Sequence, residues 1–484
     1  MILKEIINNV KIESLIGNDS VEVNGIEFDS RKIVAGTMFV AMRGTVVDGH
    51  DFIEKAQEMG AIVVVCEKLP KQMKESLTYV QVKDSTFALG LLASNFYGNP
   101  SQNMQVVGVT GTNGKTTIAT VLYDLFRSLG EKVGLFSTVC NYIDGEAYPT
   151  DHTTPDALEI NKLMAEMYSR GVKYVFMEVS SHSVVQHRIN GLHFVGGIFT
   201  NLTRDHLDYH KTFKAYLEAK KLFFDNYLDK KAFALTNIDD KNGNVMLQNT
   251  QAKKYSYSLL QQADYKVKVV EECFDGMQLE INGKEVWVPF IGRFNALNLT
   301  AIAGTANLLG VDFYKVLIAL SAMKPVSGRF EPIVSNDGKI AIVDYAHTPD
   351  ALDNVLSTIN EIRNGKNNLI TIVGCGGNRD KGKRPMMAKS AVSASDKVIV
   401  TSDNPRNEKP EDIINDMLEG LTDKEKKKVL TIIDRREAIK TAVFLAQPGD
   451  VILIAGKGHE DYQIIGTEKL HFSDQEEVMK FFEN

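Results

Sequence analysis

The stretch from Val106 to Thr117 reads Val-Val-Gly-Val-Thr-Gly-Thr-Asn-Gly-Lys-Thr-Thr and carries the clearest chemical signal in the sequence. A β-branched run leads into a glycine-rich loop, and a helical pattern of apolar residues follows. Strand, loop and helix are the setting of a phosphate-binding loop, in which Lys115 would reach the outer phosphates and the Thr116 hydroxyl would bind Mg²⁺. Val109 stands where the generic pattern has its first glycine, and the alternative interpretation is a glycine turn with a solvated lysine.

Two further groups have the chemistry of metal ligands. Glu178 ends an expected strand, where a carboxylate near a phosphate loop can hold Mg²⁺ directly or through water, although a strand-end Glu can also simply face water. Asp205, His206 and Asp208 lie close together in sequence. A zinc site is one interpretation, but no cysteine is near and the spacing is not that of a helical H-E-x-x-H motif. A second Mg²⁺ site fits a nucleotide better, and a polar loop is the third alternative.

The later part of the chain offers groups suited to a nucleotide. Asn295 and Asn298 share one helix face, where they would cap the helix or contact a base edge, and capping is the commoner role. Arg329 can neutralise phosphate charge, and Asp344, near His347, can bind ribose hydroxyls. A surface ion pair and a strand-end turn are equally good interpretations of Arg329 and Asp344.

Three strand-end loops carry charges that would suit a zwitterion. Arg379, Arg406 and Glu460 each follow a different expected strand, so they would meet at one edge of a sheet. Arginines bind carboxylates, and a glutamate binds an ammonium. Lys220, by contrast, stands beside another lysine on an expected helix, and this pattern is typical of one solvated face, so the residues themselves assign it no role.

The elements that would position these groups alternate in an α/β pattern. Strands are expected at 62–66, 79–82, 172–179 and 195–200, and helices at 87–97 and 213–227. Residues 250–290 show alternating β patterns. Five strands are expected at 340–344, 369–373, 397–401, 429–433 and 451–455, with helices between most of them, as in a doubly wound sheet. The 484 residues exceed one core and suggest about three domains.

Composition excludes several classes of protein. The net charge of −7 argues against general nucleic-acid binding, and the four scattered cysteines form no C-x-x-C pair. The N-terminus lacks the layout of a signal peptide, and no apolar run approaches the length of a membrane span. We therefore expect a cytoplasmic protein without membrane insertion.

At this point the motifs together match a known family. Val-Thr-Gly-Thr-Asn-Gly-Lys-Thr-Thr, Glu-Val-Ser-Ser-His, Asn-Leu-Thr-Arg-Asp-His-Leu-Asp-Tyr-His, Gly-Arg-Phe-Glu, Asp-Tyr-Ala-His-Thr-Pro and Gly-Lys-Gly-His-Glu occur in this order. The chain resembles the Mur ligases of peptidoglycan synthesis over nearly its whole length, from the Asp-Ser-Arg run at 29–31 to Gln463. The resemblance implies a mixed α/β uridine-nucleotide domain (1–101), a central P-loop ATPase domain with a parallel sheet (102–326) and a Rossmann-like doubly wound domain for the incoming amino acid (327–484).

The resemblance also implies a reaction. The D-glutamate γ-carboxylate of UDP-N-acetylmuramoyl-L-alanyl-D-glutamate would attack the γ-phosphate of ATP, and the amine of a third amino acid would displace phosphate from the resulting acyl phosphate. Catalysis would rest on positioning and on charge neutralisation by Lys115, two Mg²⁺ ions and His206. The counterpart of Lys220 carries a CO₂-derived carbamate that binds the second Mg²⁺. Arg406 lies in a run resembling the family's motif for meso-2,6-diaminopimelate, so we expect this amino acid, and we expect a monomer.

Matched positions assign the site residues. The expected catalytic residues are Lys115, Glu178, His206, Lys220 and Arg329. The expected ATP contacts are Gly111, Thr112, Asn113, Gly114, Lys115, Thr116, Thr117, Asn295, Asn298, Arg329, Asp344 and His347. The expected metal ligands are Thr116, Glu178, His206 and Lys220 as carbamate. The expected contacts to the UDP-linked substrate are Ser30, Thr45, Val46, Val47, Thr153, Thr154, Ser180, Gln186 and Arg188. The expected amino-acid contacts are Arg379, Asp403, Asn404, Pro405, Arg406, Gly456 and Glu460.

Three rival functions share some of these features. The first is the L-lysine-adding enzyme of the same family. The second is a ligase like folylpolyglutamate synthase, against which the Asp-Ser-Arg and Asp-Asn-Pro-Arg runs argue. The third is a P-loop switch without ligation chemistry. A GTPase of that kind would show an Asn-Lys-x-Asp base-reading motif, and the nearest run, Asn237-Ile-Asp-Asp240, lacks the lysine.

Overall fold

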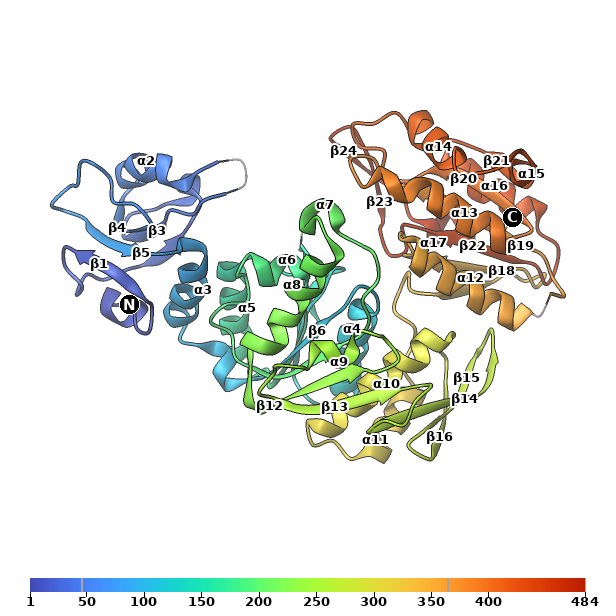
Figure 1. Cartoon of the computed structure of the whole chain (residues 1–484), viewed down its shortest axis with the longest axis horizontal. Helices are drawn as coiled ribbons and strands as arrows, with labels where there is room; N and C mark the ends of the chain where they lie inside the picture. The colour runs from blue at the N-terminus through green and yellow to red at the C-terminus, as the bar shows by residue number, and fades with distance from the viewer. Residues whose placement is uncertain (45–46, 151, 364, 484) are drawn as a thin grey trace.

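Three β-sheets follow one another along the chain in the computed structural model (Figure 1). The structure describes residues 1–44, 47–150, 152–363 and 365–483, and it leaves the side chain of Asp208 undescribed. The sheets have five, eleven and six strands, and a two-stranded hairpin accompanies the last. The predicted α/β class with three successive parts is confirmed.

The N-terminal part is a small mixed sheet with the strand order β1-β5-β4-β3-β2. The strands are β1 (Ile12–Ile16), β2 (Gly25–Glu27), β3 (Thr37–Val40), β4 (Ala61–Cys66) and β5 (Thr78–Val82). Helix α3 (Ser85–Phe96) packs against α1 (Leu3–Ile6) and against α5 (Ala157–Ser169) of the central part. The strands expected at 62–66 and 79–82 and the helix expected at 87–97 are confirmed to within two residues.

The central sheet has a parallel core with the order β14-β13-β12-β11-β6-β10-β7. These strands are β6 (Gln105–Thr110), β7 (Val133–Phe136), β10 (Tyr174–Glu178), β11 (Phe194–Phe199), β12 (Leu228–Asn237), β13 (Lys253–Ser258) and β14 (Tyr265–Cys273). Antiparallel pairs extend both edges: β15 (Gly276–Ile281) with β16 (Lys284–Val288), and β8 (Asn141–Ile143) with β9 (Glu146–Tyr148). The region 250–290 therefore continues the central sheet, because β13 pairs in parallel with both β12 and β14.

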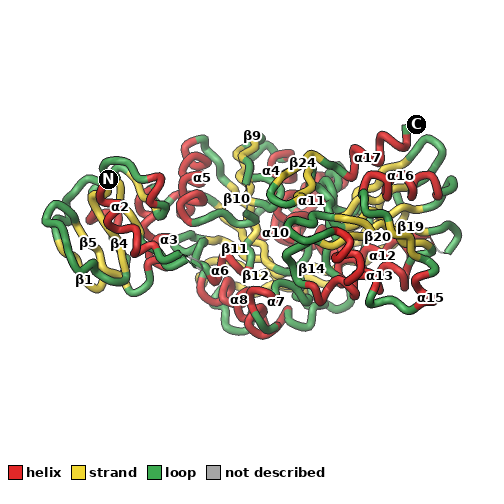
Figure 2. The backbone as a smooth tube through the Cα atoms, turned by 90° about the horizontal axis from the view of Figure 1, so that it is seen from above, coloured by secondary structure: helices red, strands yellow, loops and turns green. Residues whose placement is uncertain are grey.

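Helices cover both faces of this sheet (Figure 2). Helices α4 (Lys115–Ser128) and α10 (Arg293–Leu308) share a core with Val107 of β6, and α5 and α8 (Phe213–Asn226) share the opposite core with Val106. Neighbouring strand residues point to opposite faces, so a short apolar run such as that of β6 serves both cores. The shorter helices are α6 (Ser181–Val185), α7 (Leu207–His210), α9 (Gly243–Met246) and α11 (Phe313–Ser321).

The C-terminal sheet has the order β17-β18-β22-β19-β20-β21, parallel except for the edge strand β17. Its strands are β17 (Glu331–Val334), β18 (Ile340–Asp344), β19 (Leu369–Cys375), β20 (Lys397–Ser402), β21 (Val429–Thr431) and β22 (Val451–Ala455). Helices α12 (Pro349–Arg363), α13 (Arg384–Ala394) and α14 (Pro410–Leu418) pack on one face, and α16 (Arg435–Leu445) and α17 (Asp474–Phe482) on the other. The five expected strands are all present; β17 and the hairpin of β23 (Tyr462–Ile465) and β24 (Glu468–His471) are additional.

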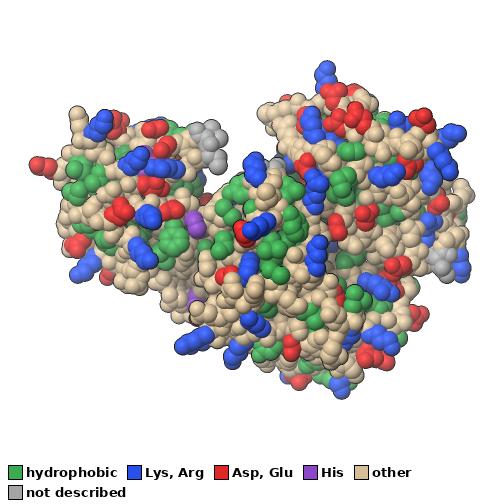
Figure 3. Space-filling view, in the orientation of Figure 1, with side chains coloured by type: hydrophobic (Ala, Val, Ile, Leu, Met, Phe, Trp, Pro, Cys, Tyr) green, Lys and Arg blue, Asp and Glu red, His purple; other side chains and the backbone are tan. Residues whose placement is uncertain are grey.

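The surface is hollowed between the N-terminal and C-terminal parts, above the central part (Figure 3). Among the described residues, no helix is long and apolar enough to cross a membrane. The loops after the parallel strands of the central and C-terminal sheets carry many of the residues singled out above, whereas Lys220 lies on α8 and Asn295 and Asn298 lie on α10.

Candidate active site

The loop between β6 and α4 has the backbone conformation of a phosphate-binding loop. Gly111 (φ +153°) and Gly114 (φ +87°) have positive φ values that side chains rarely adopt. A Cβ at Gly111 would lie 1.8 Å from Thr200 Oγ1, and one at Gly114 would lie 2.7 Å from Asn298 Oδ1. Val109 stays within β6, so the departure from the generic pattern falls in the strand and leaves the loop intact.

Two lysines lie beneath this loop, Lys115 half-buried and Lys220 fully buried. Lys115 Nζ donates to the carbonyl oxygens of Gly111 (3.0 Å) and Thr112 (2.8 Å), and Lys220 Nζ donates to that of Gly111 (2.7 Å). Lys220 is 1% exposed, so the interpretation of its helix face as solvated was wrong. Burial is the main cause that lowers the pKa of each amine, and Lys115 further lowers that of Lys220. Burial and the neighbouring Lys115 thus both disfavour the protonated form of Lys220.

Glu178 offers an unused carboxylate oxygen near Lys115. The residue is 0% exposed at the end of β10, and Oε1 accepts a hydrogen bond from the backbone N–H of Thr138 (2.7 Å). The Oε2 atom is buried with no hydrogen-bond partner among the described residues. A buried carboxylate oxygen without a partner lowers the stability of the fold. An ion that binds there would remove this cost, which explains why the oxygen is kept free. The free Oε2 atom therefore suits the role of Mg²⁺ ligand predicted for Glu178.

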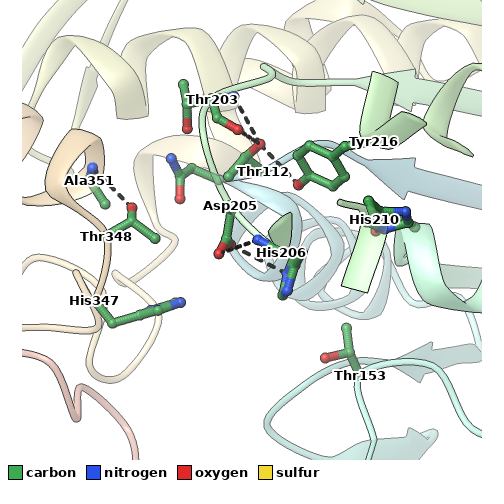
Figure 4. Close-up of polar contacts among 12 residues, drawn as sticks. Thr112, Thr153, Thr203, Asp205, His206, His210, Tyr216, His347, Thr348 and Ala351 are labelled. Carbon is green, nitrogen blue, oxygen red and sulfur yellow. Dashed lines mark hydrogen bonds and ion pairs between the residues drawn. The ribbon is translucent and has the colours of Figure 1, made fainter. Parts of the chain in front are cut away.

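The loop after β11 brings an imidazole to the same site (Figure 4). His206 has φ +52°, and its Nε2 lies 3.3 Å from Asp205 Oδ2. Burial lowers its pKa to about 4, so the ring is neutral near pH 7, as a metal-binding imidazole must be. The predicted charge neutralisation by His206 would therefore act only through a bound ion. The side chain of Asp208 lies outside the described residues, among which no three His, Cys, Asp or Glu side chains form a metal cluster.

The C-terminal part closes the site from the opposite side. Arg329 Nη2 donates to Thr116 Oγ1 at 3.2 Å, and its guanidinium lies 4.4 Å from the centroid of the Tyr345 ring. Asn113 Nδ2 donates to Asp350 Oδ2 at 3.4 Å. These contacts join the phosphate-binding loop to residues more than 200 positions away in sequence. Arg329 is thereby placed at the phosphate-binding loop, as predicted, and not in a surface ion pair.

Asp344 and His347 follow β18 in the same region. The two carboxylate oxygens of Asp344 accept hydrogen bonds from the backbone N–H groups of Phe330 and Ala346, both at 2.7 Å. Asp344 therefore shapes the turn that carries Arg329, whatever further contact it makes. His347 points toward Asp205 in Figure 4.

The two asparagines of α10 do not cap it. The helix begins at Arg293, and its N-cap is Gly292, so capping was the wrong interpretation. Asn295 Nδ2 donates to the carbonyl of Ile291 (2.7 Å), and Asn298 Nδ2 donates to Asn295 Oδ1 (3.2 Å). Asn298 Oδ1 faces the Cα of Gly114, so the pair lies beside the phosphate-binding loop.

Four of the residues expected to contact the UDP-linked substrate form one network at the end of β10. Thr154 Oγ1 donates to the carbonyl of Glu178 (2.8 Å) and lies 3.3 Å from Ser180 Oγ. Arg188 donates to the carbonyl of Thr154 (2.7 Å) and to Gln186 Oε1 (2.9 Å). Sequence reasoning therefore selected residues that are close in space.

The remaining residues of this group lie in different places. Thr153 Oγ1 accepts a hydrogen bond from Thr138 Oγ1 at 3.1 Å, next to Glu178. Ser30 and Val47 belong to the N-terminal part, where Ser30 is buried and Val47 is exposed. Thr45 and Val46 lie outside the described residues. The structure thus brings the central members of this group together, and the contacts of all its members with a substrate stay a prediction.

The loops of the C-terminal sheet bring together the predicted amino-acid contacts. Asn404 Nδ2 donates to Glu460 Oε2 at 2.9 Å. Arg406 has φ +51°, and its Nη1 donates to the carbonyls of Gly377 (3.0 Å) and Asn404 (3.4 Å). Arg379, whose side chain is exposed, follows the same glycine run. Opposite charges thus lie in adjoining loops, as the zwitterion interpretation requires.

Two glycines shape these loops. Gly456 has φ +120°, and a Cβ there would lie 2.8 Å from Asp403 Oδ2. A Cβ at Gly377 would lie 1.9 Å from the Pro405 carbonyl. Close approach of the loops therefore requires both glycines.

Sequence reasoning missed Lys457, which lies between the two loops. It is 0% exposed and contacts both Asn404 and Glu460. Its only signal is its position inside Gly-Lys-Gly-His-Glu. Thr138, Tyr345 and Asp350 were missed as well, because neither their types nor their spacing differ from those of ordinary loop residues.

Comparison with known proteins identifies the family. Three family models match in succession: "Mur ligase family, catalytic domain" at residues 22–97, "Mur ligase middle domain" at 109–306 and "Mur ligase, glutamate ligase domain" at 328–458. A protein of Phocaeicola vulgatus named UDP-N-acetylmuramoyl-L-alanyl-D-glutamate--2,6-diaminopimelate ligase is 60% identical over the whole of both chains. Proteins with this name from Cytophaga hutchinsonii (54% identity, 98% of each chain) and Clostridium acetobutylicum (41% identity, 99% of each chain; its name ends in 1) also match.

Solved structures agree with this result. A structure of a UDP-N-acetylmuramoyl-L-alanyl-D-glutamate--2,6-diaminopimelate ligase matches with a TM-score of 0.71 and 32% identity over 100% of this chain and 99% of that one. A folylpolyglutamate synthase from Thermotoga maritima matches with a TM-score of 0.58 and 17% identity over 76% of this chain and 90% of that one, which is a likeness of fold alone. With its phosphate-binding loop, its three domain matches and its full-length relatives, the chain belongs to the Mur ligase family.

Proposed function

We propose that this protein is an ATP-dependent ligase that adds meso-2,6-diaminopimelate to the D-glutamate γ-carboxyl group of UDP-N-acetylmuramoyl-L-alanyl-D-glutamate, releasing ADP and phosphate. The names of its full-length relatives support the proposal. The observation that carries this proposal is the hydrogen bond from Arg329 to Thr116 in the phosphate-binding loop. This bond joins a nucleotide site to the domain that presents Arg406 and Glu460.

ATP would bind along the phosphate-binding loop, with Asn295 and Asn298 beside it. Lys115 and Arg329 would neutralise the phosphate charge that develops during transfer. Both are already held in place, Lys115 by two backbone carbonyls and Arg329 by Thr116 and the Tyr345 ring. Preorganised charges of this kind need little reorganisation during the reaction.

Thr116 and Glu178 would hold one Mg²⁺, and His206 with a modified Lys220 would hold the second. Bound Mg²⁺ supplies charge neutralisation to the phosphates. The free Oε2 of Glu178 and the neutral ring of His206 fit this use. The lowered pKa of Lys220 supports its modification, because an uncharged amine is the form that reacts with CO₂, and the resulting carbamate is an anion suited to Mg²⁺.

The enzyme would then accelerate the reaction mainly by positioning the reactants. The γ-carboxylate attacks the γ-phosphate, ADP leaves, and the acyl phosphate so formed accepts the amine, which expels phosphate. Thr154, Ser180 and Arg188 would orient the UDP-linked substrate at the end of β10, next to Glu178. Holding both reactants in line can supply several kcal/mol of the barrier lowering, roughly 7–11 in the best cases.

Selectivity for diaminopimelate would come from Arg406. This substrate differs from lysine by a distal carboxylate, which a planar guanidinium can bind through two parallel hydrogen bonds. Glu460 would take the neighbouring ammonium. Lysine would bring only a cation toward Arg406, which repels it.

We also propose domain boundaries, an oligomeric state and a cellular location for this protein. We place the domains at 1–101, 102–326 and 327–484, which the ranges of the three family models support. We propose a monomer that acts in the cytoplasm on peptidoglycan precursors.

The deciding experiment measures phosphate release by the purified protein with ATP, Mg²⁺ and the UDP-linked substrate, adding one amino acid at a time. Diaminopimelate should give rapid release, and L-lysine should give release slower by about 10²-fold or more. Release with lysine alone would identify the L-lysine-adding enzyme. Release with L-glutamate and a folate acceptor would identify a folylpolyglutamate synthase-like ligase.

A further inference from the structure

Lys457 is a fully buried cation in the loop after β22, and nothing in the proposed reaction uses it. Its Nζ lies 3.2 Å from Asn404 Oδ1, 3.3 Å from Glu460 Oε2 and 4.0 Å from Asp403 Oδ1. It also lies 5.6 Å from the centroid of the Tyr462 ring. One ammonium group thus lies between two carboxylates, and these belong to the loops that carry the proposed amino-acid contacts.

The orientation of Asn404 depends on this ammonium. Asn404 Oδ1 accepts from Lys457 Nζ and from the backbone N–H of Ile464 (2.9 Å), so the Nδ2 group must point the other way. It donates to Glu460 Oε2 at 2.9 Å. All the described hydrogen bonds of the Glu460 carboxylate use Oε2, so Lys457 and Asn404 together fix one oxygen of this carboxylate and leave Oε1 as the atom for a ligand.

We infer that Lys457 is a positioning residue that keeps Glu460 ionised and correctly oriented to bind the ammonium group of the incoming amino acid. The inference rests on the proposed function, since it specifies how the amino-acid site works. Without Lys457, Asp403 and Glu460 would be two buried carboxylates beside each other, and such a pair holds a proton. A protonated Glu460 loses its attraction for an ammonium group.

The charges around Glu460 support this view. Burial raises the pKa of the Glu460 carboxyl group, Asp403 raises it further, and Lys457 and Asn404 lower it. The other ionisable groups that interact with it are Tyr345, Tyr462 and Arg435. Removing Lys457 must therefore raise this pKa. The affinity for the amino acid should then fall at neutral pH and recover as the pH rises.

The test compares Lys457→Met with the wild-type enzyme in kcat/KM for diaminopimelate as a function of pH. The acid limb of the profile should move to higher pH, and KM for diaminopimelate near pH 7 should rise by about 10-fold or more, since a charged contact is lost. KM for ATP should stay within about 2-fold. Val443→Ala, a buried change in α16 away from these groups, is the control for destabilisation and should leave the limb in place.

A double-mutant cycle with Glu460→Gln separates positioning from general support of the fold. Glu460→Gln should be costly in the wild-type enzyme and nearly neutral in Lys457→Met near pH 7, because Glu460 is then already uncharged. Should Lys457→Met fail to fold, Lys457→Gln keeps a donor for Asn404 without the charge and should show the same shift. An unmoved acid limb together with additive losses would overturn the inference. A wild-type enzyme that does not use diaminopimelate would instead overturn the proposed function.

Discussion

Replacing Arg406 by methionine should remove the preference for diaminopimelate while leaving the ATP site intact. The described hydrogen bonds of the Arg406 guanidinium are all made by Nη1, which donates to two backbone carbonyls. A guanidinium has five N–H donors, so the edge formed by Nε and Nη2 is available for a carboxylate. This is the edge that binds a carboxylate through two parallel bonds.

The size of the effect follows from those two bonds. A hydrogen bond between charged partners contributes about 1.5–3 kcal/mol, and Arg406 is partly exposed, so we take a total of ~3 kcal/mol from the lower end of the range. This corresponds to a loss of about 10²-fold in kcat/KM for diaminopimelate. L-Lysine has no distal carboxylate and so makes no such bonds with Arg406. Its kcat/KM should therefore stay constant, or rise because the repulsion between its ammonium group and Arg406 disappears.

The assay measures kcat/KM for both amino acids on wild-type enzyme and Arg406→Met, with saturating ATP and UDP-linked substrate. Exposed Lys440→Met is a matched control, since it removes a cation from α16 of the same domain. Equal losses for diaminopimelate and lysine would contradict this role, because they would mean that Arg406 supports the loop and does not bind the distal carboxylate.

Three further changes test the ATP and metal sites. Lys115→Ala should lower turnover by about 10²-fold or more with an unchanged circular dichroism spectrum, and near-normal turnover would contradict the role of the loop. Lys220→Ala should be nearly inactive and partly rescued by acetate, and full wild-type activity under CO₂-free conditions would argue against a carbamate. Glu178→Gln keeps the size of the side chain and should lower kcat by about 10²–10³-fold, with a weaker response to added Mg²⁺; an unchanged Mg²⁺ titration would exclude Glu178 as a ligand.

The phosphate-binding loop was predictable because its signal is local. Strand, glycine turn, Lys115 and helix are contiguous, and the conformations of Gly111 and Gly114 follow from the loop itself. The network of Thr154, Ser180 and Arg188 was found only through the family resemblance, since its members are ordinary polar residues in separate segments.

The remaining features depend on contacts distant in sequence. The burial of Lys220 is decided by the loop that folds over α8, and the pattern of α8 alone indicated solvent. The role of Asn298 follows from the approach of α10 to Gly114. Lys457 contacts the nearby Glu460 but gains its contact with Asn404 from a loop more than 50 residues away, so its place between the two loops could not be read from the local sequence.

The product that the wild-type enzyme makes is the most direct test of the proposed function. The purified protein is incubated with ATP, Mg²⁺, the UDP-linked substrate and equal amounts of meso-2,6-diaminopimelate and L-lysine, and the product is identified by mass spectrometry. We predict that nearly all of the product carries diaminopimelate. A product that carries mainly lysine, or no amide product at all, would contradict it.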